Sequence, residues 1–370
     1  MMCSFILKRI FPQMGFFLLF ILITTTGCKK QKEDTSSQDK GLKDYYSGFF
    51  PIGASVGPSN LTGEESILLK KEFNSITAEN AMKPAPIHPA ENSYYWTDAD
   101  KIVDFAMANG MKVRGHTLCW HQQTPSWMFL DATGNKVTKD VLLQRLKDHI
   151  KTVVTRYKGK VYAWDVVNEA IDDDNSKTYR ESSWYTICGE EYIASAFIWA
   201  HEADPDALLF YNDYNTESAS KREKIYNMIK KLLDAGVPVH GIGLQGHWSI
   251  YWPAETDILS SIARFSSLGI KIQITELDVS VYSSNADFSV RTPGDDLFTS
   301  DMEQKQISFY KSIFMDFRIN RNLINGITFW NISDRHSWLD NYPVANRKNY
   351  PLLFDQNLKP KKAYREVVNF

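Results

Sequence analysis

The sequence predicts an α/β fold, a (β/α)8 barrel that makes up a single domain. Three observations support this prediction. Eight short apolar runs occur along the chain, helical patterns separate most of them, and the length of 370 residues suits one barrel. An open doubly wound sheet fits less well, because the first turn, residues 53–57, lacks the Gly-x-Gly-x-x-Gly pattern of nucleotide-binding folds.

Each expected strand is a run of apolar, aromatic or β-branched residues that ends in polar residues. In chain order these runs cover residues 49–56, 73–80, 111–120, 161–169, 208–215, 239–247, 271–279 and 324–332. Amphipathic patterns predict helices at residues 98–109, 139–157, 190–202, 221–234, 256–267 and 302–317. Residues 283–301 are mostly polar, which indicates a long loop after the seventh strand.

The N-terminal residues indicate an export signal rather than a part of the barrel. Basic residues precede an apolar run at residues 14–23. This run is shorter than the roughly 20 residues that a membrane-spanning helix needs, so we expect residues 1–27 to be removed as a signal peptide. Residues 28–43 are polar and predict a flexible tether, and residues 44–370 are the expected barrel domain.

The end of this signal resembles that of a bacterial lipoprotein. Thr26 and Gly27 precede Cys28, which would become the lipidated first residue of the mature chain. The match is incomplete, since Thr25 stands where such signals usually have Leu. The alternative is an ordinary secretory signal with an incidental cysteine. We expect an exported protein that is anchored to a bacterial membrane only through this lipid, on a face that the sequence leaves open.

Composition and charge narrow the possible functions. The formal net charge is −2 and no block of like charges follows the tether, which argues against nucleic acid as a partner. Cys119 and Cys188 are the cysteines of the barrel domain, and we expect two isolated buried thiols. The eight histidines show no metal-binding spacing, so we expect no metal and no cofactor. We also expect a monomer.

Polar residues follow nearly every predicted strand. In a barrel, the functional groups collect where the strands end. Any one of these residues is more often a loop residue or a helix cap than a functional group, but together they favour a polar pocket with aromatic walls. The residues in question are Glu79, Asn80, His116, Trp120, Asn168, Glu169, Asn212, Asp213, Tyr214, Asn215, Gln245, His247, Glu276, Asp278 and Trp330.

Glu169 and Glu276 stand out among these residues, because barrel closure would bring them together. Hydrolysis of a glycosidic bond needs such a pair: one carboxylic acid protonates the leaving oxygen, and one carboxylate attacks the anomeric carbon or activates water. Strand periodicity places Asp278 on the same face as Glu276. His247 could then hydrogen-bond to either carboxylate and keep Glu276 ionised. The alternative for His247 is a buried histidine that is bonded to the backbone.

Strict alternation along the fourth strand would point Asn168 and Glu169 to opposite faces. Both side chains can reach one substrate only if the backbone leaves regular strand geometry at this point. We therefore predict a bulge or an early end of the strand. We also predict a raised pKa for Glu169, since two carboxylates in one pocket resist simultaneous ionisation.

Seven motifs give the chain a resemblance to a known family. They are TAENAMK, RGHTLCWH, WDVVNEA, YNDYN, GLQGHW, ITELDV and ITFWNISDRHSW. With these motifs in this order, residues 50–364 resemble family 10 glycoside hydrolases, which are retaining endo-β-1,4-xylanases on a (β/α)8 barrel. The resemblance implies one catalytic domain that acts on xylan and xylo-oligosaccharides.

The resemblance also implies roles for individual residues. Glu169 would be the acid/base and Glu276 the nucleophile. The residues implied in binding the sugars are Glu79, Asn80, Lys83, His116, Trp120, Asn168, Gln245, His247, Trp330 and Trp338, with Asp278 and Tyr214 in support. Trp330 and Trp338 would form a wall on the non-reducing side that leaves little space for a glucose hydroxymethyl group.

Two positions depart from the family pattern, and three other functions stay open. Asn331 stands where the family usually has Gly, and Leu339-Asp340 stands where a basic residue is common. Both positions could alter the tryptophan wall. The same two glutamates would also suit a β-1,4-glucanase or a mannanase. A non-catalytic, lipid-anchored carbohydrate-binding protein is the third alternative, although a protein that only binds sugar has no need of two facing carboxylates.

Overall fold

The computed structural model describes residues 40–283 and 297–370. The expected signal peptide at 1–27, most of the tether at 28–43 and most of the loop at 283–301 lie outside the described residues. Within the described ranges, no helix has both the length and the apolarity needed to cross a membrane.

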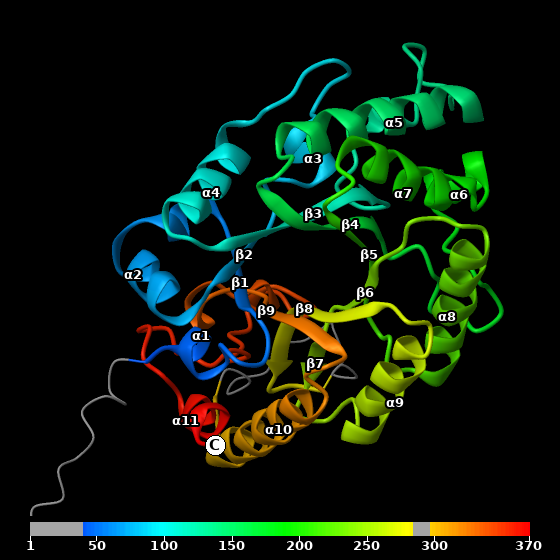
Figure 1. The fold of residues 1–370 in the computed structure, drawn as a ribbon. Helices are drawn as coiled ribbons and strands as arrows, with labels where there is room; N and C mark the ends of the chain where they lie inside the picture. Colours follow the sequence, from blue (N-terminus) through cyan, green and yellow to red (C-terminus); the bar gives the residue numbers. More distant parts are fainter. Residues whose placement is uncertain (1–39, 284–296) are drawn as a thin grey trace, which may run out of the picture. The chain divides into compact units, whose positions relative to one another are not determined.

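Eight parallel strands close into a barrel, which confirms the predicted fold (Figure 1). The barrel strands are β1 (Ile52–Val56), β2 (Ser75–Ala78), β3 (Lys112–Trp120), β4 (Val161–Asn168), β5 (Leu208–Asp213), β6 (Gly241–Leu244), β8 (Lys271–Ser280) and β9 (Ile324–Phe329). They follow one another around the barrel, and the pairings of β6 with β8 and of β9 with β1 close it. A short strand, β7 (His247–Ser249), pairs with the end of β8.

Helices surround this barrel (Figure 1). They are α1 (Leu42–Tyr45), α2 (Gly63–Glu72), α3 (Pro84–Ile87), α4 (Thr97–Ala108), α5 (Lys139–Arg156), α6 (Ser183–Cys188), α7 (Glu191–Ala203), α8 (Ala219–Asp234), α9 (Glu255–Ser266), α10 (Ser300–Ile319) and α11 (Lys362–Val368), with short 3-10 turns at Pro58–Leu61, Ser126–Met128, Asp334–His336 and Trp338–Asp340. The six predicted helices are confirmed within about two residues.

Helix α2 was not predicted, and its buried face explains why. The buried positions of α2 include Glu65, Ser66 and Glu72 beside a single large apolar residue, Leu69. Such a helix lacks the apolar stripe from which periodicity predicts a helix. Glu72 is instead satisfied by polar contacts, since its Oε2 accepts hydrogen bonds from the backbone of Leu42 at 2.8 Å and from Tyr364 at 2.9 Å.

The folded part of the chain begins slightly earlier than predicted. Leu42, which the sequence assigns to the tether, is fully buried and caps the barrel next to α2. Gly41 packs so closely on the Lys71 carbonyl that an added Cβ would lie 2.1 Å from its oxygen. Close packing of a glycine and burial of a leucine are properties of a folded domain rather than of a tether.

Charged side chains as well as apolar ones fill the barrel interior. Arg114 on β3 forms a two-point ion pair with Asp165 on β4, with N–O distances of 2.7 and 3.2 Å, and its Nε donates to Gln273 at 2.6 Å. Both charges are buried, so each needs the other as a partner. The free thiols of Cys119 and Cys188 are buried too, as predicted.

Candidate active site

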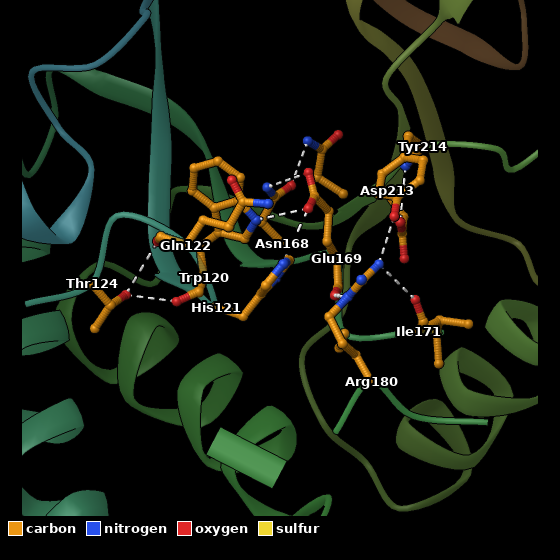
Figure 2. A network of polar contacts seen from close by, with 12 residues as sticks. Trp120, His121, Gln122, Thr124, Asn168, Glu169, Ile171, Arg180, Asp213 and Tyr214 are labelled. Atoms are coloured by element: carbon orange, nitrogen blue, oxygen red, sulfur yellow. Dashed lines mark hydrogen bonds and ion pairs between the residues drawn. The ribbon is translucent and has the colours of Figure 1, made fainter. Parts of the chain in front are cut away.

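The carboxyl ends of the strands gather the predicted site residues into one network. Glu169 lies at its centre (Figure 2). Strand β4 ends at Asn168, and Glu169 adopts a positive φ of 58°. Its backbone N–H donates to the carbonyl of Asn212 on β5 at 2.9 Å. The predicted departure from strand geometry is thus confirmed as an early strand end, and it brings Asn168 and Glu169 to the same side.

Three side chains donate hydrogen bonds to the Glu169 carboxyl group. Trp120 Nε1 lies 2.8 Å from Oε2, while Gln245 Nε2 and Asn168 Nδ2 lie 2.9 and 3.2 Å from Oε1. Burial raises the pKa of Glu169, and the negative charge of Asp213 adds to this effect. The donors only partly oppose the rise. Glu169 is thus a carboxyl group that retains its proton at a higher pH than an exposed glutamate does.

Glu276 has the opposite environment. Its Oε1 accepts from Asn212 Nδ2 at 2.7 Å and its Oε2 contacts His247 Nε2 at 3.2 Å. Burial alone would raise the pKa of Glu276, but its electrostatic interaction with His116 and its bond to His247 outweigh burial and lower the pKa. Glu276 is therefore ionised, next to a Glu169 that resists ionisation.

His247 bridges two carboxylates. Its Nδ1 lies 3.0 Å from Asp278 Oδ2 and its Nε2 lies 3.2 Å from Glu276 Oε2. Burial would lower the pKa of His247, but these carboxylates outweigh burial and raise it to about 10. As an imidazolium, the ring donates to both partners. The predicted contact with Glu276 and Asp278 is confirmed, and the alternative of a bond to the backbone is not found.

Asn212 connects the two glutamates; the sequence placed it among the polar strand-end residues but gave it no role of its own. Its Nδ2 donates to Asn168 Oδ1 at 2.9 Å as well as to Glu276, and its Oδ1 accepts from Thr275 at 2.6 Å. An unbroken chain of hydrogen bonds thus leads from Glu169 through Asn168 and Asn212 to Glu276. The position of Asn212 at the end of the fifth strand was the available signal, but alternation along that strand did not distinguish it from its neighbours.

His116 is held by the buried ion pair below it. Its Nδ1 lies 3.0 Å from Asp165 Oδ2 and 3.9 Å from Glu276 Oε1. Trp164 packs against β3 one residue before His116, where Gly115 leaves room for its ring: a Cβ at Gly115 would lie 2.1 Å from the indole. A buried carboxylate therefore orients His116, and the neighbouring Gly115 leaves the space that Trp164 fills.

Glu79, Asn80 and Lys83 form a second polar group, which follows β2. Lys83 Nζ bonds to Asn80 Oδ1 at 3.0 Å and lies 5.0 Å from the centre of the Trp120 ring. Burial raises the pKa of Glu79 and lowers that of Lys83. The predicted set thus adjoins the site through Trp120.

The two predicted wall tryptophans flank His247. The Trp330 ring lies 5.3 Å from that of His116 and 6.2 Å from that of His247. Trp338 lies 4.9 Å from the His247 ring, and its Nε1 donates to Asp278 Oδ2 at 2.8 Å. The carboxylate of Asp278 therefore fixes a tryptophan and a histidine at once.

The departures from the family pattern have local explanations. Asn331 has a φ of 120°, a conformation that favours glycine. Its side chain compensates, because Oδ1 accepts from the backbone of Ile332 at 3.1 Å and Nδ2 donates to the His336 carbonyl at 2.6 Å. Asp340 pairs with Lys348 at 2.7 Å and accepts from the backbone of Asn349 at 2.9 Å.

Arg180 connects the loop after β4 to Tyr214 (Figure 2). Arg180 Nε donates to the Glu169 carbonyl at 3.1 Å, and Nη2 donates to the Tyr214 hydroxyl at 2.7 Å. That hydroxyl donates to Asp173 at 2.5 Å. Sequence reasoning included Tyr214 but missed Arg180, which lies in a loop without a periodic pattern.

His121 also lies closer to the site than the sequence suggested. It directly follows β3, and its Nδ1 lies 3.9 Å from Glu169 Oε2. Burial, reinforced by the charges of Arg180 and Lys221, lowers its pKa to about 4, so the ring is neutral near pH 7. No group of three or more His, Cys, Asp or Glu in the described ranges is arranged to hold a metal ion. The site therefore suits chemistry that needs a protonated carboxyl group, Glu169, beside a carboxylate, Glu276.

The chain is similar to a known family and to characterised xylanases. The model of glycosyl hydrolase family 10 matches residues 41–370. A β-1,4-xylanase of Dictyoglomus thermophilum is 50% identical over 354 residues, which cover 95% of this chain and 97% of the relative. An endo-1,4-β-xylanase B of Paenibacillus barcinonensis is 47% identical over 333 residues, 90% of this chain and 99% of that one.

Solved structures are also similar to this chain over most of its length. The crystal structure of a xylanase from Paenibacillus barcinonensis in complex with a conduramine derivative has a TM-score of 0.85 at 48% identity, and the match covers 89% of this chain and 98% of that chain. A mutant structure in complex with xylotriose has a TM-score of 0.84 at 44% identity, with 89% and 99% covered.

Proposed function

The chain belongs to glycoside hydrolase family 10, and from this membership we propose that it is a retaining endo-1,4-β-xylanase that cleaves internal β-1,4-xylosidic bonds in xylan. The observation that carries this proposal is the pairing of Glu169 and Glu276 in opposite protonation states, linked through Asn168 and Asn212. A retaining glycosidase needs an acid and a nucleophile in this relation.

In the first step, Glu169 gives its proton to the glycosidic oxygen while the Glu276 carboxylate attacks the anomeric carbon. The bond to the leaving sugar breaks, and a covalent glycosyl–enzyme intermediate forms. Trp120, Gln245 and Asn168 orient the acid through their hydrogen bonds. His247 and Asn212 hold the nucleophile with its charge available.

In the second step, the now ionised Glu169 takes a proton from water, and the water oxygen attacks the anomeric carbon. The bond to Glu276 breaks, so the product retains the β configuration. Loss of the Glu276 negative charge on glycosylation removes one cause of the raised pKa of Glu169. Glu169 therefore becomes a base at the stage at which a base is required.

The remaining site residues bind sugars in this proposal. Asn168 hydrogen-bonds to the 2-hydroxyl of the sugar being cleaved, a contact that strengthens in the transition state. The same sugar contacts His116, Trp120, Gln245 and His247. Glu79, Asn80 and Lys83 bind the next sugar on the non-reducing side, while Trp330 and Trp338 cover both. Asp278 supports His247, and Tyr214 supports the loop on the leaving-group side.

Initial rates on unbranched xylan, soluble β-1,4-glucan and β-1,4-mannan test the substrate, with the anomer of the first product followed by NMR. We expect the highest kcat/KM on xylan and β-configured products. A higher value on glucan or mannan would replace xylan as the substrate, and α-configured products would refute retention. Glu169→Gln and Glu276→Gln should each lower the rate on xylan at least about 100-fold, which a protein that only binds sugar would not show.

We also propose that the protein is exported as a monomer and anchored through a lipid on Cys28. Support comes from the sequence: a basic start, an apolar run and Thr26-Gly27-Cys28, followed by a polar tether. Expression of the full chain in a bacterium with labelled palmitate tests this proposal. Label on the wild type but not on Cys28→Ser is expected, whereas equal absence of label from both would indicate an ordinary secretory signal.

A further inference from the structure

The ring contacts of the site continue beyond the predicted wall. His116 contacts Trp330, Trp330 contacts His247, and His247 contacts Trp338, with ring centroids between 4.9 and 6.2 Å apart. Trp338 then stacks on Tyr342, at 5.1 Å and with an interplanar angle of 18°. A continuous row of rings therefore leads from the neighbours of the nucleophile to Tyr342.

The outer end of this row is open to solvent. The Tyr342 side chain is 59% exposed, and Trp338 covers one face of its ring. A large aromatic side chain that is kept at the surface beside a binding site loses hydrophobic stabilisation unless a ligand covers it. Neither the core nor the catalytic steps described above use this ring.

The segment that carries Tyr342 is fixed at several points. Trp338 is bonded to Asp278, and Asp340 is bonded to Lys348 and to the backbone of Asn349. Asn341 Oδ1 accepts from the backbone of Asn346 at 3.3 Å. A ring on a preorganised segment loses little conformational entropy when it binds a ligand.

We propose that Tyr342 forms a distal binding site for one further xylose unit, beyond the sugars covered by Trp330 and Trp338 on the non-reducing side. The inference rests on the proposed function. The apolar C–H face of a pyranose ring stacks on an aromatic face without any charged partner, and a β-1,4-linked chain that lies along the row would bring its next ring to Tyr342. The site would favour longer chains over short oligosaccharides.

The alternative role for Tyr342 is support of Trp338 without sugar contact. The two roles differ in their dependence on chain length. If Tyr342 only supports Trp338, removal of its ring weakens the binding of every substrate that reaches Trp338. If Tyr342 forms a distal site, removal of its ring weakens the binding of only those substrates that are long enough to occupy this site.

Aryl β-xylobioside and aryl β-xylotrioside separate the two roles, because the aryl leaving group fixes which bond is cleaved. The measured quantity is the ratio of kcat/KM for the trioside to that for the bioside, for the wild type, Tyr342→Ala and Tyr342→Phe. We expect a ratio clearly above one for the wild type. Tyr342→Ala should lower the ratio about threefold to tenfold, the range for one aromatic stacking contact, and Tyr342→Phe should keep it because the ring remains.

Tyr251→Ala is the matched control, since this tyrosine is also exposed (53%) but lies near Lys305 on the outer helix α10. It should leave the ratio unchanged. An unchanged ratio in Tyr342→Ala, or an equal loss on both substrates, would overturn the distal site. A wild type that releases aryl alcohol from neither substrate and no oligosaccharide from xylan would instead refute the proposed function.

Discussion

At the scale of single residues, the neighbours of each glutamate determine its protonation state. Glu169 is buried and lies near the negative charge of Asp213. The neutral hydrogen-bond donors around it only partly oppose these two effects, so its pKa is raised. Glu276 is equally buried but faces His116 and His247, and its pKa is lowered. The same side chain thus suits an acid in one place and a nucleophile in the other, which are the roles we propose for Glu169 and Glu276.

These shifts predict the pH dependence of kcat/KM. Activity requires Glu276 ionised and Glu169 protonated, so the rate falls as pH drops through the pKa of Glu276 and as pH rises through that of Glu169. The His247→Asn change removes one cation beside Glu276 and should move the acid limb to higher pH. His201→Asn, on the outer helix α7, should not move it. A shift confined to the basic limb in His247→Asn would contradict these assignments.

The backbone at Asn331 gives a second prediction. Because its φ is 120°, glycine fits the conformation, whereas alanine is strained and also lacks both side-chain hydrogen bonds. Asn331→Ala should lower the free energy of unfolding by about 1–3 kcal/mol, and Asn331→Gly by less. Denaturant melts of the two variants measure the difference. A glycine variant less stable than the alanine variant would disprove this explanation.

Some site residues could be predicted from sequence and others could not. Glu169, Glu276, Asn168 and His247 lie at or near the carboxyl ends of the predicted strands, so their meeting follows from barrel closure. Arg180 and His121 lie in loops, where neither periodicity nor strand ends restrict the direction of a side chain. For Tyr342 the same limit holds, because its stacking on Trp338 depends on the path of a loop.

At the scale of elements, strands were easier to predict than helices. Parallel barrel strands are buried on both faces and stand out as apolar runs. Helix α2 was missed because buried Glu72 is satisfied by Leu42 and Tyr364, two partners remote in sequence. A helix stabilised by such contacts leaves no periodic signal.

A buried histidine pair between α3 and α5 predicts sensitivity to acid. His88 Nδ1 lies 3.2 Å from His149 Nδ1, and burial lowers their pKa values to about 4 and about 3. The unfolded chain binds these protons near the ordinary pKa of about 6.5, so stability should fall as pH drops from there towards 4.

The His149→Gln change removes one of these two titrating groups. The loss of melting temperature between pH 7 and pH 4.5 should therefore be smaller in His149→Gln than in the wild type, even if the variant is less stable at pH 7. A larger loss in the variant would show that the pair does not contribute to acid sensitivity. His240→Gln should change this loss less, because His240 is only half-buried.

Three backbone carbonyl groups of the loop after β4 share one ammonium group as donor. Lys224 Nζ donates to the carbonyl oxygens of Asp172, Asp174 and Lys177 at 2.5, 2.9 and 2.8 Å. Lys224→Met should leave these oxygens without their donor and make residues 172–177 accessible to proteases. The control is Lys230→Met, which removes an exposed pair with Asp234. Equal cleavage of both variants would exclude the role of Lys224.

At the scale of the whole molecule, the barrel brings two distant strand ends into one hydrogen-bonded chain. Glu169 follows β4 and Glu276 lies in β8, and β5 and β6 between them supply Asn212 and Gln245. The Gln245 carbonyl also accepts from the Glu276 backbone at 2.7 Å. Closure of the sheet therefore brings Glu169 and Glu276 together, as the sequence predicted from strand order.

The most direct test of the central claim is mass spectrometry of the enzyme after reaction with an aryl 2-deoxy-2-fluoro-β-xylobioside. The fluorine slows both steps, whereas a good aryl leaving group keeps the first step fast, so the covalent intermediate accumulates. We expect one fluoroxylobiosyl group per chain, on the peptide that contains Glu276, and none on Glu276→Gln. An adduct on another residue, or turnover with no adduct and with α-configured products, would contradict the account.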